Sequence, residues 1–158
     1  MMNFYVNQIG SIKFIGYDIF IKIDAPYIAA LNGVEDFSHI SVLWWFNHCD
    51  NEHSRSILEV KKPYKTSPEI LGTFATRSPE RPNPIALSTV QIINVDFSEG
   101  LIQIPYIDAE DNSPVLDIKP YTPSLDRVDS FSAPTWCSHW PKNLEDSSEF
   151  NWEEEFNF

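Results

Sequence analysis

The sequence predicts a mainly β protein, a small β-barrel with short helical turns and an aromatic, acidic C-terminal extension. Short apolar runs with the alternation typical of strands are separated by turn residues, and the chain has 12 prolines in 158 residues. The chain has no G-x-G-x-x-G between a strand and a helix, which disfavours a parallel dinucleotide-binding sheet. Together these observations favour an antiparallel or mixed barrel.

Length and composition predict one domain rather than two, because 158 residues with 42% hydrophobic content can bury a core of their own. We expect a barrel over residues 1–126 and an extension over residues 127–158. No run approaches the roughly 18 apolar residues of a membrane span. The N-terminus lacks a basic region followed by an apolar one. The sequence therefore predicts a cytoplasmic protein without a membrane partner.

The first half of the chain predicts three strands and one helical segment. Alternating apolar residues indicate two short strands within residues 3–23. An aspartate followed by a first-turn proline predicts one or two helical turns over residues 26–31. Residues 40–46 are almost wholly apolar, which predicts a strand buried on both faces or one that closes a barrel. The polar residues 49–70 predict a long exposed loop.

The second half predicts three further strands before the extension. Residues 85–95 have the alternation of one long strand. Residues 101–107 form another apolar run, in which Pro105 indicates an edge or bulge position. Residues 115–119 predict a short strand ahead of a further proline pair. Polar turn residues separate these runs, as expected of a β-rich fold.

The C-terminal extension combines aromatic and acidic side chains. Its tryptophans at 136, 140 and 152 are too apolar for a free tail, so we expect them to pack on the barrel or on a partner subunit, with the acids outward. A cation-binding aromatic cage is the alternative. The two cysteines, at 49 and 137, have no C-x-x-C spacing and are expected to be free thiols. No histidine has ligand spacing with them, so no metal is expected.

Charge is distributed unevenly along the chain. The net charge of -12 opposes a nucleic-acid partner at first sight. Six of the acids lie in residues 144–158, which contain no basic residue. Residues 55–81 instead carry six bases against three acids. This segment is either a solvated lysine-rich loop or a surface for an anionic partner.

A proline-rich loop between two apolar runs carries the most distinctive chemistry. Prolines at 79, 82 and 84 restrict the backbone of residues 78–83 to nearly one path. Arg77 and Arg81 lie on this stiff segment, and arginine forks suit carboxylate or phosphate oxygens. The loop is therefore either an anion clamp or a rigid surface turn whose arginines pair with neighbouring acids.

Three segments of this sequence resemble the motifs of one family. They are GVEDFSHISVLWWF at 33–46, FATRSPERPNPIALS at 74–88 and IDAEDNSPVLDIKPYTPSLD at 107–126. In this order they resemble the TsaA-like family, whose best-known members are the TrmO enzymes. These enzymes use S-adenosylmethionine to methylate a modified adenosine beside the anticodon of certain tRNAs. The resemblance implies a TsaA-like β-barrel that pairs as a homodimer, with cofactor bound near the subunit interface.

The resemblance also implies which residues bind S-adenosylmethionine. Carried over to this sequence, the cofactor contacts fall at Asn47, His48, Arg77, Leu87, Asp108, Ala109 and Glu110. Arg81 and Asn83 share the central motif and serve either the cofactor or the substrate. In chemical terms, arginine suits a carboxylate or phosphate, and carboxylates suit ribose hydroxyls or amino groups.

Methyl transfer is a displacement that needs alignment and exclusion of water, together with removal of a proton from an amine nucleophile. Asp117 is our candidate for orienting that nitrogen or accepting its proton, with Lys119 and Tyr121 close in sequence. The alternative is a structural ion pair, because Asp117 and Lys119 lie two residues apart on one face of a strand.

Three functions remain open from the sequence. The first is a methyltransferase acting on threonylcarbamoyladenosine in tRNA. The second is a methyltransferase of the same fold with a small-molecule or protein substrate. The third is a non-catalytic S-adenosylmethionine-binding module.

Overall fold

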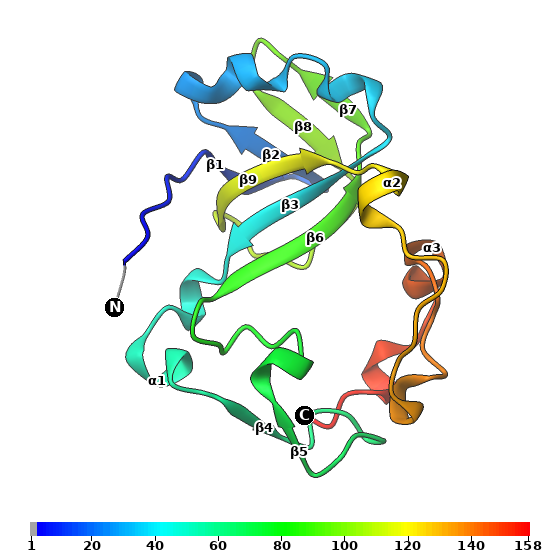
Figure 1. Cartoon of the computed structure of the whole chain (residues 1–158). Helices are drawn as coiled ribbons and strands as arrows, with labels where there is room; N and C mark the ends of the chain where they lie inside the picture. Colours follow the sequence, from blue (N-terminus) through cyan, green and yellow to red (C-terminus); the bar gives the residue numbers. More distant parts are fainter. Residues whose placement is uncertain (1–2) are drawn as a thin grey trace. The chain divides into compact units, whose positions relative to one another are not determined.

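The computed structural model describes residues 3–158, so Met1 and Met2 of the expected domain 1–126 lie outside the described residues. The chain divides into two compact units, each made of two separate segments (Figure 1). Unit 1 comprises the chain up to Asn51 together with Asn83–Arg127, and unit 2 comprises Glu52–Pro82 together with Val128–Phe158. The C-terminal extension therefore groups with residues 52–82. A packing of the extension on a partner subunit stays a prediction.

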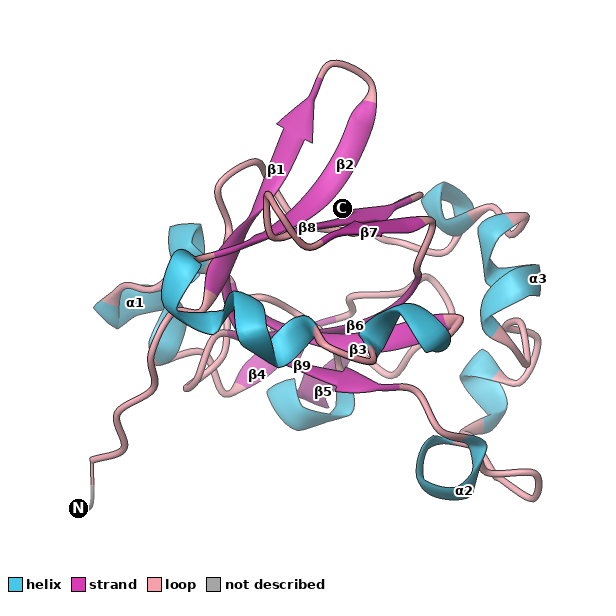
Figure 2. Ribbon diagram, turned by 90° about the horizontal axis from the view of Figure 1, so that it is seen from above, coloured by secondary structure: helices cyan, strands magenta, loops and turns pink. Residues whose placement is uncertain are grey.

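Unit 1 is built on a seven-stranded antiparallel sheet with the order β6-β3-β9-β1-β2-β8-β7. Its strands are β1 (Gly10–Ile15), β2 (Asp18–Ile23), β3 (His39–Trp45), β6 (Ile85–Gln91), β7 (Asn94–Asp96), β8 (Leu101–Ile104) and β9 (Pro114–Pro120). Figure 2 shows β3, β6 and β9 together on one side of the unit, and β7 and β8 on the other.

The expected closed barrel is not found, because the sheet has two open ends. Among residues 3–158, β6 pairs only with β3, and β7 pairs only with β8. Strand β7 has only three residues, all of them paired with β8. Its other edge is therefore too short for β6 to pair along it and close the sheet. The expectation of a mainly β, antiparallel architecture with short helices is confirmed.

One face of the sheet forms the core of unit 1. Seven apolar side chains from five strands are fully buried: Ile12, Ile21, Ile40, Val42, Ile102, Ile104 and Val115. Burial of each isoleucine contributes about 1.5–3 kcal/mol. Strand β3 alternates between buried and half-buried residues, so the expected burial on both faces was wrong. It also lies between β6 and β9, not at a closing seam.

Two predicted strands differ from the structure. One is divided because its backbone partners are distant in the sequence, and the other is shortened by a proline. The expected strand over residues 85–95 is split into β6 and β7. The N–H of Ile92 donates to the carbonyl of Ser38 at 2.9 Å, and the N–H of Ile93 donates to Gln103 at 2.8 Å. The chain therefore changes partner at this point. Strand β8 ends just before Pro105, which lacks the N–H that a ladder needs.

The helical elements of unit 1 are short. They are the 3-10 helices η1 (Ala25–Leu31), η2 (Val34–Asp36) and η3 (Asn47–Cys49), and the α-helix α2 (Pro123–Asp126). Helix η1 confirms the helical turns expected over residues 26–31, and its Leu31 is buried. Of the two strands expected within residues 3–23, the first begins only at Gly10.

Unit 2 gives regular structure to much of the segment 49–70 that the sequence predicts as a loop. Its elements are α1 (Glu52–Arg55), β4 (Glu59–Lys61), β5 (Ile70–Gly72), η4 (Thr73–Ala75), η5 (Thr135–Cys137), α3 (Leu144–Ser148) and η6 (Trp152–Glu154). Strands β4 and β5 form an antiparallel pair. The prediction missed this pair because the two strands contain only three residues each and β4 carries two charged side chains.

The interior of unit 2 is aromatic. Tyr64 stacks on Trp136 with ring centroids 5.4 Å apart, and it contacts Trp140 edge-on at 4.9 Å. Trp152 in turn contacts Trp140 edge-on at 5.2 Å. The tail tryptophans therefore pack on one another and on Tyr64 within this unit, and their packing on the barrel or on a partner subunit stays a prediction. Both Cys49 and Cys137 are free thiols, as expected. Within residues 3–158, no helix has the length and apolarity needed to cross a bilayer.

Candidate functional site

Within unit 2, Arg81 is used to shape the proline-rich loop. Its Nε donates to the carbonyl of Ser78 at 2.8 Å, and its Nη2 donates to the carbonyls of Thr73 at 3.2 Å and Thr76 at 2.7 Å. The guanidinium therefore ties together three points of the loop. Neither sequence alternative described this arrangement, since the partners of Arg81 are backbone carbonyls and not acids.

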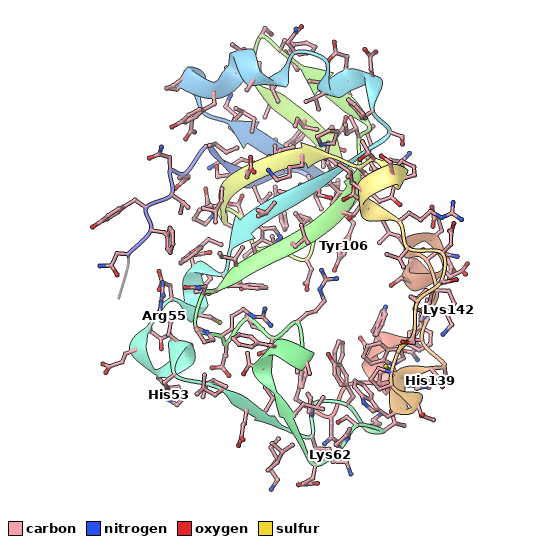
Figure 3. All side chains as sticks on the ribbon, in the orientation of Figure 1. His53, Arg55, Lys62, Tyr106, His139 and Lys142 are labelled. Atoms are coloured by element: carbon pink, nitrogen blue, oxygen red, sulfur yellow. The ribbon has the colours of Figure 1, made fainter. Side chains whose placement is uncertain are left out.

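Two further contacts attach the loop to α1. Arg55 (Figure 3) donates from Nη1 to the carbonyl of Pro82 at 3.0 Å. Ser54, which is buried, donates from Oγ to Glu80 at 3.2 Å. Local sequence pattern could not predict these two contacts, because the partners lie 26 and 27 residues apart.

Arg77 lies on the same loop with an exposed side chain. It is close enough to Tyr64 to act on the pKa of that phenol. Burial raises the pKa of Tyr64, the neighbouring Cys137 raises it further, and the positive charge of Arg77 lowers it. Arg77 thus presents its charge beside the aromatic interior of unit 2.

Within unit 1, two of the sequence-predicted segments meet. His48 lies in η3, directly after β3, and Glu110 lies in the loop between β8 and β9. The Nε2 atom of His48 is 2.8 Å from Oε2 of Glu110, and the two side chains are 69% and 74% exposed. An exposed ion pair of this kind contributes little stability, about 0–1 kcal/mol. Its importance is positional, because it holds the two segments together.

The neighbours of this pair were also predicted from the sequence. Asn47 precedes His48 in η3 and is exposed. Asn83 is exposed just before β6, and the N–H of Phe46 donates to the next carbonyl, that of Pro84, at 2.8 Å. These contacts bring the end of β3 and the start of β6 to the same end of the sheet.

The loop before β9 contributes both a buried and an exposed residue. Ala109 packs against the core and Asp108 is exposed. Asp108 lies close to Tyr106 (Figure 3), whose pKa is raised first by burial and then by the negative charge of Asp108. The core contact of Ala109 fixes the backbone, so that the carboxylates on either side point to solvent.

Leu87 and Asp117 lie in one row across the sheet. Leu43 of β3 is opposite Leu87 of β6 on one side and opposite Asp117 of β9 on the other. All three are outside the fully buried core, on the face opposite Val42. With strands about 4.8 Å apart, Asp117 and Leu87 are separated by roughly 10 Å.

A β-bulge sets the orientation of Asp117. The register between β3 and β9 shifts between Leu43 and Trp44, so Leu116 is the extra residue. Without the bulge, Asp117 would change faces, because side chains alternate along a strand. Sequence reasoning missed this feature, since no residue between Val115 and Asp117 marks a bulge.

The carboxylate of Asp117 has two local partners. One oxygen accepts a hydrogen bond from the N–H of Ile118 at 3.0 Å, and the other is 2.5 Å from Nζ of Lys119. The ion pair considered from the sequence is therefore present. Tyr121 lies elsewhere, after the end of β9. Its N–H donates to the carbonyl of His39 at 3.0 Å, and the two rings meet edge-on at 6.4 Å.

The described part of the chain contains no cluster of three or more metal-ligating side chains. The exposed polar groups at the end of the unit 1 sheet are an amide, an imidazole and carboxylates. Such groups can hydrogen-bond a polar organic ligand, and Leu43 and Leu87 offer apolar surface to a ring.

Comparison with known proteins gives consistent results. A family model described as the N-terminal domain of tRNA-methyltransferase O matches residues 14–127. A protein of Archaeoglobus fulgidus named S-adenosyl-L-methionine-binding protein is 42% identical over 108 residues, which are 68% of this chain and 72% of that one. The putative S-adenosylmethionine-dependent methyltransferase RcsF of Pseudomonas aeruginosa is 40% identical over 101 residues, or 64% of this chain and 42% of its own length.

Solved structures agree with the family model. A crystal structure of TrmO has a TM-score of 0.65 and 30% identity, over 84% of this chain and 64% of that chain. TrmO from Pseudomonas aeruginosa has a TM-score of 0.63 and 28% identity, over 83% of this chain and 62% of that chain. This chain thus covers slightly under two thirds of the solved TrmO chains. The motif resemblance is confirmed, and the protein belongs to the TrmO family through a tRNA-methyltransferase O N-terminal domain.

Proposed function

We propose that this protein is an S-adenosylmethionine-dependent methyltransferase that methylates threonylcarbamoyladenosine beside the anticodon of tRNA, on its exocyclic nitrogen. Family membership supports the proposal. The observation that carries it is the 2.8 Å contact between His48 and Glu110, which joins two motif-bearing segments at one end of the sheet. A tRNA substrate would also agree with the cytoplasmic location expected from the sequence.

The residues of unit 1 fit the chemical groups of S-adenosylmethionine. Asn47 and the carboxylate of Asp108 can hydrogen-bond ribose hydroxyls or the adenine amino group. Glu110 carries a negative charge that suits the sulfonium. Leu87 is 51% exposed and offers an apolar surface to the adenine ring. Ala109 would act through its backbone, which its core contact holds in place.

The proposed mechanism depends mainly on alignment. The bound cofactor supplies an electrophilic methyl group, so the protein must orient the acceptor nitrogen in line with it and take up one proton. Asp117 remains the candidate for this role, since a carboxylate has about four acceptor positions and only two are used by Ile118 and Lys119. Lys119 would hold the carboxylate of Asp117 in place. Tyr121, which lies beside His39, would help to position the end of β9.

Arg77→Ala is expected to weaken S-adenosylmethionine binding while leaving the thermal unfolding midpoint unchanged. The loss of one charge-assisted contact costs about 1.5–3 kcal/mol, or roughly a tenfold to hundredfold rise in Kd. Isothermal calorimetry measures this directly. Arg127→Ala removes the same charge outside the motif and should bind as wild type does. Equal Kd values for the Arg77 and Arg127 variants would contradict the assignment.

Asp117→Asn is expected to reduce kcat for methyl transfer by roughly a hundredfold, as for loss of a general base. The Kd for S-adenosylmethionine should stay unchanged. Lys119→Met tests the alternative. If the two residues form only a structural ion pair, both variants will lower the unfolding midpoint equally and retain full kcat. Single-turnover methyl transfer and thermal unfolding together separate the two roles.

Light scattering is expected to give the mass of a homodimer at micromolar concentration. The motive is the family resemblance together with the exposed aromatic residues of the chain, among them Phe4, Tyr5, Tyr17 and Phe158. A monomer mass over the whole concentration range would remove the expectation of a cofactor site near a subunit interface.

Mass spectrometry of tRNA nucleosides tests the proposed function as a whole. Cells lacking the protein should lose the methylated form of threonylcarbamoyladenosine, and expression of the wild type should restore it, whereas the Asp117→Asn variant should not. If the nucleoside is unchanged while labelled donor modifies another fraction of cell extract, the substrate is a small molecule or a protein. Donor binding without any transfer would identify a binding module.

A further inference from the structure

The last residues of the chain, which follow the 3-10 helix η6, pair with the lysine-rich loop of unit 2. We call residues 155–157 the tail strand and residues 61–65 the lysine loop. Tyr64 and Phe156 form an antiparallel bridge. The N–H of Lys65 donates to the carbonyl of Glu155 at 2.9 Å, and the N–H of Asn157 donates to the carbonyl of Pro63 at 3.1 Å.

Side chains strengthen this pairing at both ends. Asn157 donates from Nδ2 to the carbonyl of Lys62 at 3.1 Å. Lys62 (Figure 3) has a φ of 37°, a left-handed conformation that is costly for lysine. The ring of Phe156 lies 5.8 Å from that of Tyr64. The tail strand therefore helps to hold the lysine loop in a conformation that it would not favour alone.

Glu155 is locked into unit 2 by its side chain. Its Oε2 accepts from Nε1 of Trp140 at 3.0 Å, and its Oε1 is 2.8 Å from Nε2 of His139 (Figure 3). The hydrogen bonds from Trp140 and then His139 lower the pKa of Glu155, and the charge of Lys65 lowers it further. The acid of the tail strand and the base of the lysine loop are thus electrostatically coupled.

Glu153 and Glu154 differ from Glu155, because both are exposed. Glu153 precedes Glu155 by two residues and Glu154 by one, so each lies within about 8 Å of Glu155 along the backbone. That distance is comparable to the screening length of about 8 Å at physiological ionic strength. Lys61 and Lys65 are exposed on the other side of the pairing. Because Glu155 pairs with Lys65, the two solvent-facing acids of η6 lie one and two residues away from a residue bound to the lysine loop.

We propose that the acids of η6, Glu153 and Glu154, which the tail strand holds beside the lysine loop, compete with RNA and lower the affinity of that loop for phosphate groups. The proposal rests on the proposed function in that RNA is the polyanion considered. It adds a regulation of unit 2 by residues 128–158, which lie outside the family match over residues 14–127. Movement of the tail strand, or neutralisation of Glu153 and Glu154, would reduce the negative charge that competes with RNA for Lys65.

A binding assay with an unmodified, fluorescently labelled RNA stem-loop tests this inference. The double variant E153Q/E154Q should bind roughly fivefold more tightly than wild type in about 50 mM salt, and the gain should shrink below about twofold near 300 mM. The control E145Q/E149Q makes the same change in net charge on or next to α3. It should bind within about twofold of wild type. Adding K65Q to E153Q/E154Q should abolish the gain.

Three results would overturn the inference: equal affinities of the test and control variants, a gain that survives K65Q, or no RNA binding by any variant. Methyl transfer is measured separately on the same preparations. Tighter RNA binding by E153Q/E154Q without any methyl transfer would leave the inference standing and remove the proposed function. Methyl transfer to tRNA with equal RNA affinities would do the reverse.

Discussion

Gly10→Ala is expected to lower the free energy of unfolding by about 3 kcal/mol or more, a loss typical of severe overpacking. A Cβ atom at this position would lie 2.1 Å from the carbonyl oxygen of Lys22, and 3.1 Å from the Cα atom of Ile23. Both are backbone atoms of β2, so no side-chain rotation relieves the clash. Gly10 also pairs with Val115 of β9, which makes it part of the short junction between β1 and β9.

Urea unfolding followed by circular dichroism measures this loss. Gly72→Ala is the matched control, because its new Cβ atom would have no neighbour closer than the Leu58 oxygen at 4.0 Å. Gly72 also has a φ of -63°, which alanine adopts readily. This control should remain within about 0.5 kcal/mol of wild type. Equal unfolding midpoints for the two variants would show that the β1–β2 contact is looser than described.

Arg81→Ala is expected to destabilise unit 2 by about 2–4 kcal/mol, because three charge-assisted hydrogen bonds to the loop carbonyls are lost together. The carbonyls of Ser78, Thr73 and Thr76 would then need water as a partner. Arg81→Lys keeps the charge but lacks the planar fork, so it should restore only part of the loss. Both variants should also become more sensitive to proteolysis within residues 73–82.

The contrast with Arg77→Ala makes this prediction specific. Removal of Arg77 should change donor binding without changing stability, whereas removal of Arg81 should change stability first and donor binding as a result. Thermal unfolding and calorimetry on the two variants distinguish these patterns. An unfolding midpoint of Arg81→Ala equal to that of wild type would mean that the three hydrogen bonds contribute no net stability.

Local pattern predicted the positions of several strands, although it did not reveal that β9 pairs with the distant strands β1 and β3. Alternation within residues 3–23 gave β1 and β2, a hairpin closed by Gly16, whose φ is 66°. The apolar runs at 101–107 and 115–119 gave β8 and β9. The division of residues 85–95 could not be predicted, because it depends on carbonyls of Ser38 and Gln103 that only the folded chain brings near. The failure of the sheet to close likewise depends on strands that only the folded chain brings near one another.

The site was predicted unevenly for a similar reason. Motif resemblance singled out His48 and Glu110, which lie 62 positions apart in the sequence and are in contact in the structure. It could not reveal that Arg81 binds its own loop, since a guanidinium on a proline-rich turn suits a ligand and a backbone carbonyl equally well. The bulge at Leu116, which sets the side of the sheet that Asp117 faces, also has no marker in the sequence.

The two-segment construction of unit 2 has a consequence for the order of events during synthesis. Residues 52–82 leave the ribosome early, but the partners of Tyr64 and Pro63 are Phe156 and Asn157, more than 90 positions later. At about 5–20 residues per second, this delay lasts roughly 5–20 seconds. All strands of unit 1 have been made by Pro120. The sheet of unit 1 is therefore complete in sequence first, while residues 52–82, which have only their internal pairing of β4 with β5, still lack the C-terminal residues that contact Tyr64 and Pro63.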